Sequence, residues 1–136
     1  MADWKVLISD AIEDECKTLL SEAGVAYDDR PAITPEDLLA EIGNYHALIV
    51  RGRTQVTRAV IEAAEKLKII GRAGVGVDNI DLAAAQSQNI TVVNSPTATT
   101  DAVAEHTLAL LLSLVRNIAR ADATMKAGQW AKKELK

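Results

Sequence analysis

Apolar and polar residues alternate in short blocks along the first 94 positions. Continuous apolar runs rich in Val and Ile are typical of strands that are covered on both faces, whereas apolar residues three or four positions apart are typical of helices. The expected strands are residues 5–9, 25–29, 47–52, 68–72 and 90–94. The expected helices are residues 11–24, 34–43, 57–67 and 79–89. Because helices join successive strands, the pattern predicts an α/β domain with a doubly wound, five-stranded parallel sheet of the flavodoxin-like kind.

The second expected helix has a well-defined beginning. Thr34 is a suitable N-cap, Pro35 occupies the first helical position, and Asp37 stands three residues after the cap. Each of these residue types is favoured at that place, because the first turn of a helix has N–H groups without partners inside the helix. We therefore expect this helix to begin at Pro35.

The region after Pro96 has a different pattern. From Thr100 to about Ala127 the pattern is helical without interruption, which predicts a helix of roughly 40 Å. Residues 108–115 are apolar nearly all round, whereas a surface helix needs only one apolar stripe. We therefore divide the chain into a domain of residues 1–98 and a segment of residues 99–136. We expect a homodimer through helix 100–127, by packing of the two helices or by their exchange between subunits.

Composition and charge exclude several classes of function. The chain has 136 residues, of which 49% are hydrophobic and 25% charged, as in ordinary globular proteins. Its net charge of −4 argues against nucleic acid or an anionic membrane as a partner. The single Cys16 and the distant His46 and His106 predict no metal cluster. The N-terminus has no export signal, and the apolar stretch of residues 107–115 is less than half a membrane span, so we expect a cytoplasmic protein.

The stretch IIGRAGVGVDNID, residues 69–81, is similar at first sight to a dinucleotide-binding turn. Gly74 and Gly76 fit the first two glycines of that turn, but Asn79 stands where the third is needed for close packing. The stretch also follows the fourth strand rather than the first. The acidic residue expected about 20 positions later is missing, because the next strand ends at Asn94. This loop is therefore not expected to bind a dinucleotide by itself, and glycines that only turn the chain are the simpler alternative.

Polar side chains gather where the expected parallel strands end, which is where ligands bind in such sheets. These residues are Ser9, Asp10, Arg51, Arg72, Asn94 and Ser95. Arg51 and Arg53 are two positions apart, so their side chains point the same way if the segment is extended. A single arginine could be a solvated surface charge. Three guanidinium groups beside backbone amides freed by glycine instead predict a site for carboxylate or phosphate.

A phospho-accepting receiver module has the same kind of fold and is the rival interpretation. Its chemistry needs paired acids after the first strand and an aspartate at the end of the third strand. Asp10 suits only the first of these positions, and Arg51 stands at the second. We therefore reject the receiver interpretation.

Four segments resemble the NAD-dependent D-2-hydroxyacid dehydrogenases, and within that family the D-3-phosphoglycerate dehydrogenase branch. They are LIVRGRTQVT, LKIIGRAGVGVDNIDLAAA, VVNSPTATTDAVAEHTLALLLSLVRNI and MKAGQW, which together cover nearly the whole chain. The resemblance implies that the flavodoxin-like domain binds a small anionic substrate and that the long helix crosses into a nucleotide-binding domain. It also implies that NAD is the cofactor of the complete enzyme.

The resemblance also assigns roles to particular residues. Arg51 and Arg53 are expected to hold anionic groups of the substrate. The backbone of Ala73, Gly74, Val75 and Gly76, with Arg72 beside it, is expected to receive the substrate carboxylate near the nicotinamide. Val75, through its main chain, and Thr100 stand at positions that contact the cofactor.

Two departures from the family pattern limit this interpretation. Gly52 stands where many members of the branch have serine, which leaves the exact substrate open. The catalytic Arg, Glu and His of the family and its GxGxxG motif correspond to positions after residue 136. His106 is assigned to helix packing rather than catalysis. We therefore expect a substrate-binding portion that is inactive alone and does not bind NAD stably. The alternative is a non-catalytic flavodoxin-like module for anion binding or oligomerisation.

Overall fold

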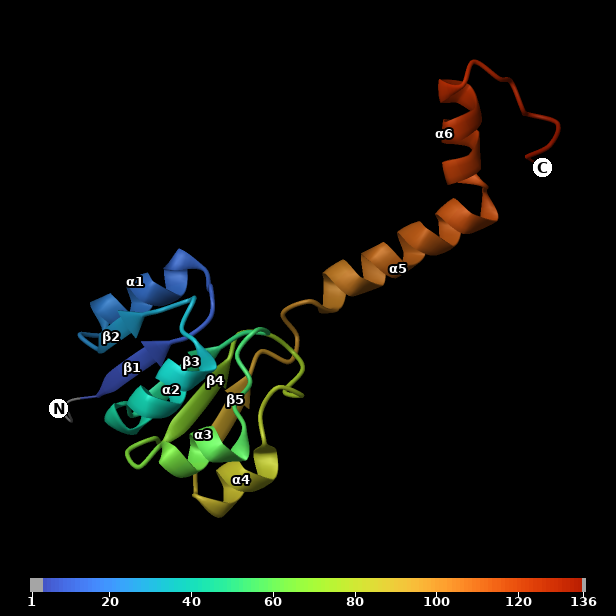
Figure 1. Ribbon diagram of the computed structural model, residues 1–136. Helices are drawn as coiled ribbons and strands as arrows, with labels where there is room; N and C mark the ends of the chain where they lie inside the picture. Colours follow the sequence, from blue (N-terminus) through green and yellow to red (C-terminus); the bar gives the residue numbers. More distant parts are fainter. Residues whose placement is uncertain (1–3, 136) are drawn as a thin grey trace. The chain divides into compact units, whose positions relative to one another are not determined.

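The computed structural model describes residues 4–135 and contains a five-stranded sheet whose neighbouring strands are all parallel (Figure 1). The strand order is β2-β1-β3-β4-β5, which is the flavodoxin-like order. The strands are β1 (Lys5–Ile8), β2 (Ala26–Asp29), β3 (Ala47–Val50), β4 (Ile69–Arg72) and β5 (Thr91–Asn94). The fold class predicted from the apolar pattern is confirmed.

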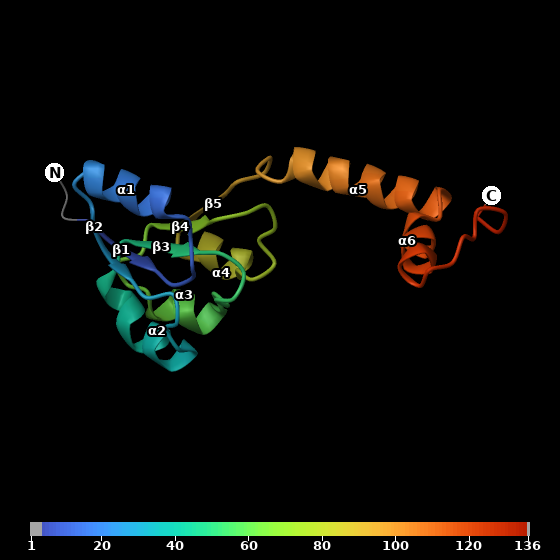
Figure 2. The same cartoon turned by 90° about the horizontal axis from the view of Figure 1, so that it is seen from above.

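The helices of this domain lie on both faces of the sheet (Figure 2). They are α1 (Asp14–Glu22), α2 (Pro35–Glu41), the 3₁₀ turn η1 (Ile42–Asn44), α3 (Arg58–Ala63) and α4 (Leu82–Ser87). Because strand side chains alternate between faces, Leu7, Leu48 and Ile70 pack with α2, α3 and α4. Val6 and Ile8 belong to a smaller cluster beneath α1. The expectation that every strand is covered on both faces fails at β5, where Val93 is 45% exposed.

Side-chain caps fix where two of the helices begin. Thr34 Oγ1 accepts a hydrogen bond of 3.1 Å from Asp37 N at the start of α2, as the sequence predicts. Asp81 Oδ1 accepts one of 2.8 Å from Ala84 N at the start of α4. The N-terminus of α4 is therefore capped by the carboxylate of Asp81.

The chain divides into two compact units, Met1–Ala98 and Thr99–Lys136. The second unit contains α5 (Thr100–Val115) and α6 (Ile118–Lys126). The prediction of one uninterrupted helix from Thr100 to about Ala127 is therefore wrong. Asn117 adopts a left-handed conformation with φ of 52°, and the two helices are bent by 62° at this break. Asparagine tolerates this conformation better than most residues, which permits a break without glycine or proline.

Among residues 4–135, no single helix is long and apolar enough to span a membrane. Only α5 and α6 taken together, across their bend, reach that length and apolarity.

Candidate functional site

A buried carboxylate organises the loop that follows β3. Asp10 stands just after β1, and only 3% of its side chain is exposed. Its Oδ2 accepts a hydrogen bond of 2.6 Å from Arg51 N, and its Oδ1 accepts another of 2.6 Å from Thr54 Oγ1. Thr54 N lies 3.2 Å from both oxygens. The side chain of Asp10 thus holds the backbone at both ends of residues 51–54 to the end of β1.

The pKa of Asp10 reflects this arrangement. Burial disfavours the charged carboxylate and acts to raise the pKa. The hydrogen bonds from Thr54 Oγ1 and from the backbone of Arg51 and Thr54, together with the positive charge of Arg53, outweigh burial and hold the pKa below its ordinary value. Asp10 is therefore an anion at neutral pH, and the donors around it satisfy its charge.

The two arginines of this loop have different surroundings. Gly52 and Arg53 form a bend, so the segment is not extended. The backbone therefore does not direct the side chains of Arg51 and Arg53 the same way, contrary to the expectation from the sequence. Arg51 extends into solvent with its side chain 55% exposed, and its one ionic partner among residues 4–135 is Glu13 at 3.5 Å. Such an exposed pair is weak, so the guanidinium is free to exchange Glu13 for another anion.

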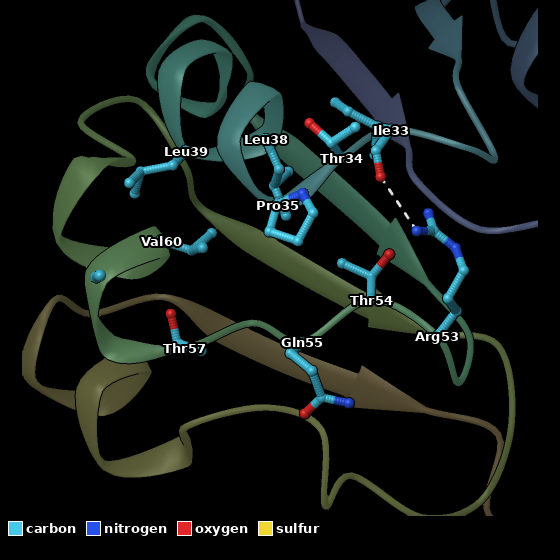
Figure 3. Close-up of a pocket in the computed structure, with 11 residues that line it drawn as sticks. Ile33, Thr34, Pro35, Leu38, Leu39, Arg53, Thr54, Gln55, Thr57 and Val60 are labelled. Atoms are coloured by element: carbon cyan, nitrogen blue, oxygen red, sulfur yellow. Dashed lines mark hydrogen bonds between the residues drawn. The ribbon is translucent and has the colours of Figure 1, made fainter.

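The guanidinium of Arg53 has three partners within the domain. Nη2 donates a hydrogen bond of 2.6 Å to the carbonyl of Ser9, and Nη1 donates one of 3.1 Å to the carbonyl of Ile33. Nε forms an ion pair with Asp10 Oδ1 at 3.3 Å. Figure 3 shows this side chain directed toward the carbonyl oxygen of Ile33. Two of these contacts are hydrogen bonds and the third is an ion pair, so Arg53 connects three segments in addition to any role toward a ligand.

Asn79 joins the loop after β3 to the loop after β4. Its Nδ2 donates a hydrogen bond of 2.7 Å to Thr54 O and lies 3.5 Å from Arg51 O. Val56 and Ile80 form an isolated parallel bridge just beyond this contact. Asn79 is only 6% exposed, so the side chain that excludes a third dinucleotide glycine instead fixes the spacing between the two loops.

The glycine loop, residues 73–76, exposes backbone N–H groups at the same edge of the sheet. Among residues 4–135, the N–H groups of Val75 and Gly76 have no hydrogen-bond partner, and both residues are exposed. The loop carbonyls are held from the other side. Ser95 N donates a hydrogen bond of 2.9 Å to Gly74 O, and Asn94 Nδ2 donates one of 2.6 Å to Val75 O. Two fixed N–H groups that face solvent are a suitable receptor for a carboxylate.

Arg72, the last residue of β4, folds back over Gly74. Its Nε is buried and has no hydrogen-bond partner within the described part of the chain. The three arginines predicted from the sequence therefore lie at one edge of the sheet, Arg72 at the end of β4 and the other two on the loop after β3. Of the three, Arg51 is the one that extends into solvent. Thr100, the other predicted contact, is the first residue of α5 in the second unit.

Two hollows adjoin the loop of residues 51–54. One, of about 320 Å³, is lined by Asp10, Ala11, Pro31, Arg51, Gly52 and Arg53. The other, of about 240 Å³, is a mainly apolar groove between α2 and α3 that has Arg53 and Thr54 at one end (Figure 3). The first hollow is the more open of the two and has Arg51 in its lining, so it is the better place for a small anion.

The described residues do not fit the pyrophosphate of a dinucleotide. That group binds where a glycine turn leads directly into the N-terminus of a helix. Here five residues separate Gly76 from α4, and Asp81 already occupies the first turn of that helix. The chemistry available at this edge is the binding of a small carboxylate or phosphate.

Sequence reasoning missed the structural roles of Asp10, Thr54 and Asn79. Asp10 and Thr54 are 44 positions apart, and neither belongs to a motif that links them. The only available signal was a carboxylate directly after a buried strand. The sequence suggested a test of Asp10 as a phosphate acceptor. In the structure Asp10 instead holds residues 51–54, which we call the arginine loop, in place.

Comparison with known proteins places these features in a family. The family described as D-isomer specific 2-hydroxyacid dehydrogenase, catalytic domain, matches residues 6–135. D-3-phosphoglycerate dehydrogenase of Methanocaldococcus jannaschii is 47% identical over 132 residues, which are 97% of this chain and 25% of the relative. The chloroplastic D-3-phosphoglycerate dehydrogenase 2 of Arabidopsis thaliana is 48% identical over 130 residues, covering 93% of this chain and 20% of the relative.

A solved structure agrees with the sequence relatives. The NAD⁺-bound 3-phosphoglycerate dehydrogenase of Entamoeba histolytica aligns with a TM-score of 0.71 and 29% identity, over 85% of this chain and 40% of that one. The chain spans about a quarter or less of the length of the two sequence relatives. The match over residues 6–135 nevertheless covers nearly every position. The chain belongs to the family of D-isomer-specific 2-hydroxyacid dehydrogenases.

Proposed function

We propose that the first unit is the substrate-binding part of an enzyme similar to D-3-phosphoglycerate dehydrogenase. The observation that carries this proposal is the exposed guanidinium of Arg51 at the same sheet edge as the unpaired N–H groups of Val75 and Gly76. A guanidinium group suits a phosphate, and fixed N–H groups suit a carboxylate. The relatives named D-3-phosphoglycerate dehydrogenase support 3-phosphoglycerate, which carries both groups, as the ligand.

Within this proposal the loops have separate tasks. Arg51 binds the more exposed anionic group, and Arg53 adds the N–H groups that its hydrogen bonds to Ser9 and Ile33 do not use. The glycine loop and Arg72 receive the other anionic group. Val75 and Thr100 are proposed to contact NAD in the complete enzyme, which oxidises 3-phosphoglycerate to phosphohydroxypyruvate in serine biosynthesis.

We further propose that the 136-residue chain binds this substrate without oxidising it. Hydride transfer from an alcohol needs a positioned proton acceptor. Neither the loop of residues 51–54 nor the glycine loop contains a histidine, and the glycine loop contains no acidic residue.

The test combines calorimetry with an activity assay on the 136-residue chain. We expect 3-phosphoglycerate and phosphohydroxypyruvate to bind more tightly than sulfate, which lacks a carboxylate. Indifference to all three anions contradicts the proposed binding function. NAD reduction in the presence of 3-phosphoglycerate, above the rate of the buffer alone, contradicts the proposed inactivity.

A second candidate function is oligomerisation. Within the second unit, α5 exposes six large aliphatic side chains over its last two turns and around its circumference. They are Leu108, Leu110, Leu111, Leu112, Leu114 and Val115, each more than half exposed. An apolar surface of this kind marks a partner surface. We propose that α5 mediates a homodimer, which is compatible with substrate binding by the first unit.

A further inference from the structure

Asp10 accepts the hydrogen bonds by which the backbone N–H groups of residues 51–54 are held to the end of β1. The side chains of Arg53 and Thr54 add contacts to the carbonyl of Ser9. Two backbone N–H groups and one hydroxyl of this loop converge on its carboxylate, which also pairs with Arg53. A buried carboxylate is costly unless it is fully satisfied, so this many donors from one loop indicate a specific arrangement. The shortest backbone contact, of 2.6 Å, is to the N–H of Arg51.

The backbone of Arg51 is therefore restrained on both sides. Its N–H is held by Asp10, and its carbonyl oxygen faces Asn79 Nδ2 at 3.5 Å. Its side chain has no comparable restraint, because Glu13 is 83% exposed and lies 3.5 Å away. The position from which the guanidinium projects thus depends on Asp10 and only weakly on its own contacts.

We propose that Asp10 is a positioning residue that holds residues 51–54 in the conformation that binds the anionic substrate, without touching the substrate itself. This proposal rests on the proposed function of the loop. It predicts a change in anion affinity opposite to the one that charge alone predicts. A carboxylate near an anion site repels the anion, so its removal should strengthen binding if only long-range charge matters. If Asp10 acts by positioning, its removal weakens binding.

Asp10→Asn is the direct test, because asparagine keeps the size and one oxygen acceptor but places an N–H₂ group against a donor. We expect affinity for 3-phosphoglycerate to fall about tenfold, as for loss of a hydrogen bond to a charged group. Asp14→Asn removes the same charge from a side chain that is 96% exposed and should not lower the affinity. A folded Asp10→Asn protein that binds as tightly as the wild type, or more tightly, overturns the proposal.

A second pair of variants keeps the proposal testable if Asp10→Asn does not fold. Thr54→Val removes the 2.6 Å hydroxyl contact to Asp10, whereas Thr54→Ser keeps it. We expect Thr54→Val to weaken binding several-fold and Thr54→Ser to bind like the wild type. Equal affinity in both variants overturns the proposal.

Amide NMR separates this proposal from the proposed function. In the wild type, the N–H signals of Arg51 and Thr54 should show the strong downfield shift of hydrogen bonds to a carboxylate, and Asp10→Asn should abolish it. Wild-type protein that shows these signals but binds no anion contradicts the proposed function and leaves the loop-holding role supported. Signals that do not respond to Asp10→Asn contradict the loop-holding role, whatever the anion affinity.

Discussion

The guanidinium group of Arg72 lies across the space that a side chain at Gly74 would occupy. A Cβ atom at position 74 would stand 2.7 Å from Arg72 Cζ and closer still to Nη1. Gly74 also has a φ of +149°, which L side chains rarely adopt. The backbone conformation therefore favours glycine at position 74, and any side chain there would also displace the guanidinium of Arg72.

Gly74→Ala should therefore affect both stability and binding. We expect the free energy of unfolding to fall by about 1–3 kcal/mol, which is the usual cost of such backbone strain. Affinity for 3-phosphoglycerate should fall as well, because the displaced loop no longer presents the N–H groups of Val75 and Gly76. Urea unfolding and calorimetry measure the two effects.

Gly52→Ala is the matched control for stability. A Cβ atom at position 52 would meet nothing within 4 Å, so the free energy of unfolding should change by no more than about 0.5 kcal/mol. Equal destabilisation by the two substitutions would show that neither the backbone conformation at Gly74 nor its contact with Arg72 requires glycine there.

Substitutions of Arg51 and Arg53 should affect anion affinity and the free energy of unfolding differently. Arg51→Ala is expected to weaken anion binding about tenfold or more, because a charge-assisted hydrogen bond contributes roughly 1.5–3 kcal/mol. It should leave stability almost unchanged, since the Arg51 side chain has only a long, exposed contact with Glu13. Arg53→Ala should lower the free energy of unfolding, because it removes contacts to Ser9, Ile33 and Asp10.

Arg58→Ala is the charge control for this series. Arg58 begins α3 with its side chain 56% exposed, and its ion pairs within residues 4–135 are the long ones with Glu62 and Asp81. It should therefore have little effect on calorimetric affinity. If Arg51→Ala and Arg58→Ala weaken binding equally, general charge attracts the anion and no specific site exists.

The lowered pKa of Asp10 predicts a loss of stability in acid. Its pKa lies below the ordinary value of 3.8 in the folded state, so the unfolded chain takes up a proton first as the pH falls. The contribution of Asp10 is fully present above that value and is lost as the pH falls through the folded-state pKa. Urea unfolding near pH 7 and at about pH 3 should show a smaller pH dependence in Asp10→Asn than in the wild type. The same slope in both proteins would contradict this assignment.

Much of the fold could be predicted because its signals are local. The beginning of α2 follows from Thr34 and Pro35, and apolar runs of a few residues define the strands. The parallel arrangement follows because helices connect successive strands. The break after α5 was missed, because Asn117 is acceptable within a helix and nothing nearby in the sequence requires it to adopt a left-handed conformation.

The candidate site was less predictable because its geometry depends on contacts between distant positions. The sequence indicates that Arg51 and Arg53 lie at the ligand-binding edge of the sheet. It does not indicate that the guanidinium of Arg53 is directed toward the carbonyl of Ser9, 44 positions away. Nor does it indicate that Asp10 and Asn79 restrain the loop from two sides. Such contacts depend on strand order and register, which place the ends of β1, β3 and β4 together.

The apolar surface of α5 leads to the last prediction, that the chain is a homodimer in solution. Leu108, Leu111, Leu112 and Val115 are spaced as one stripe along this helix. Burial of a leucine side chain contributes about 1.5–3 kcal/mol, so pairing this stripe with a second copy offsets the cost of association. The double substitution of Leu111 and Val115 by lysine should then give monomers in sedimentation equilibrium.

Leu19→Lys is the control for this dimer, because Leu19 is 66% exposed on α1 and belongs to no such stripe. It adds a charge to an exposed leucine of the first unit and should leave the sedimentation behaviour unchanged. The helix ends at Val115, so the contact needs only the length of α5 and does not require the continuous helix to residue 127 that the sequence suggested. A well-folded wild-type monomer at about tens of micromolar, where weak dimers ordinarily form, would show that α5 does not pair with its own copy.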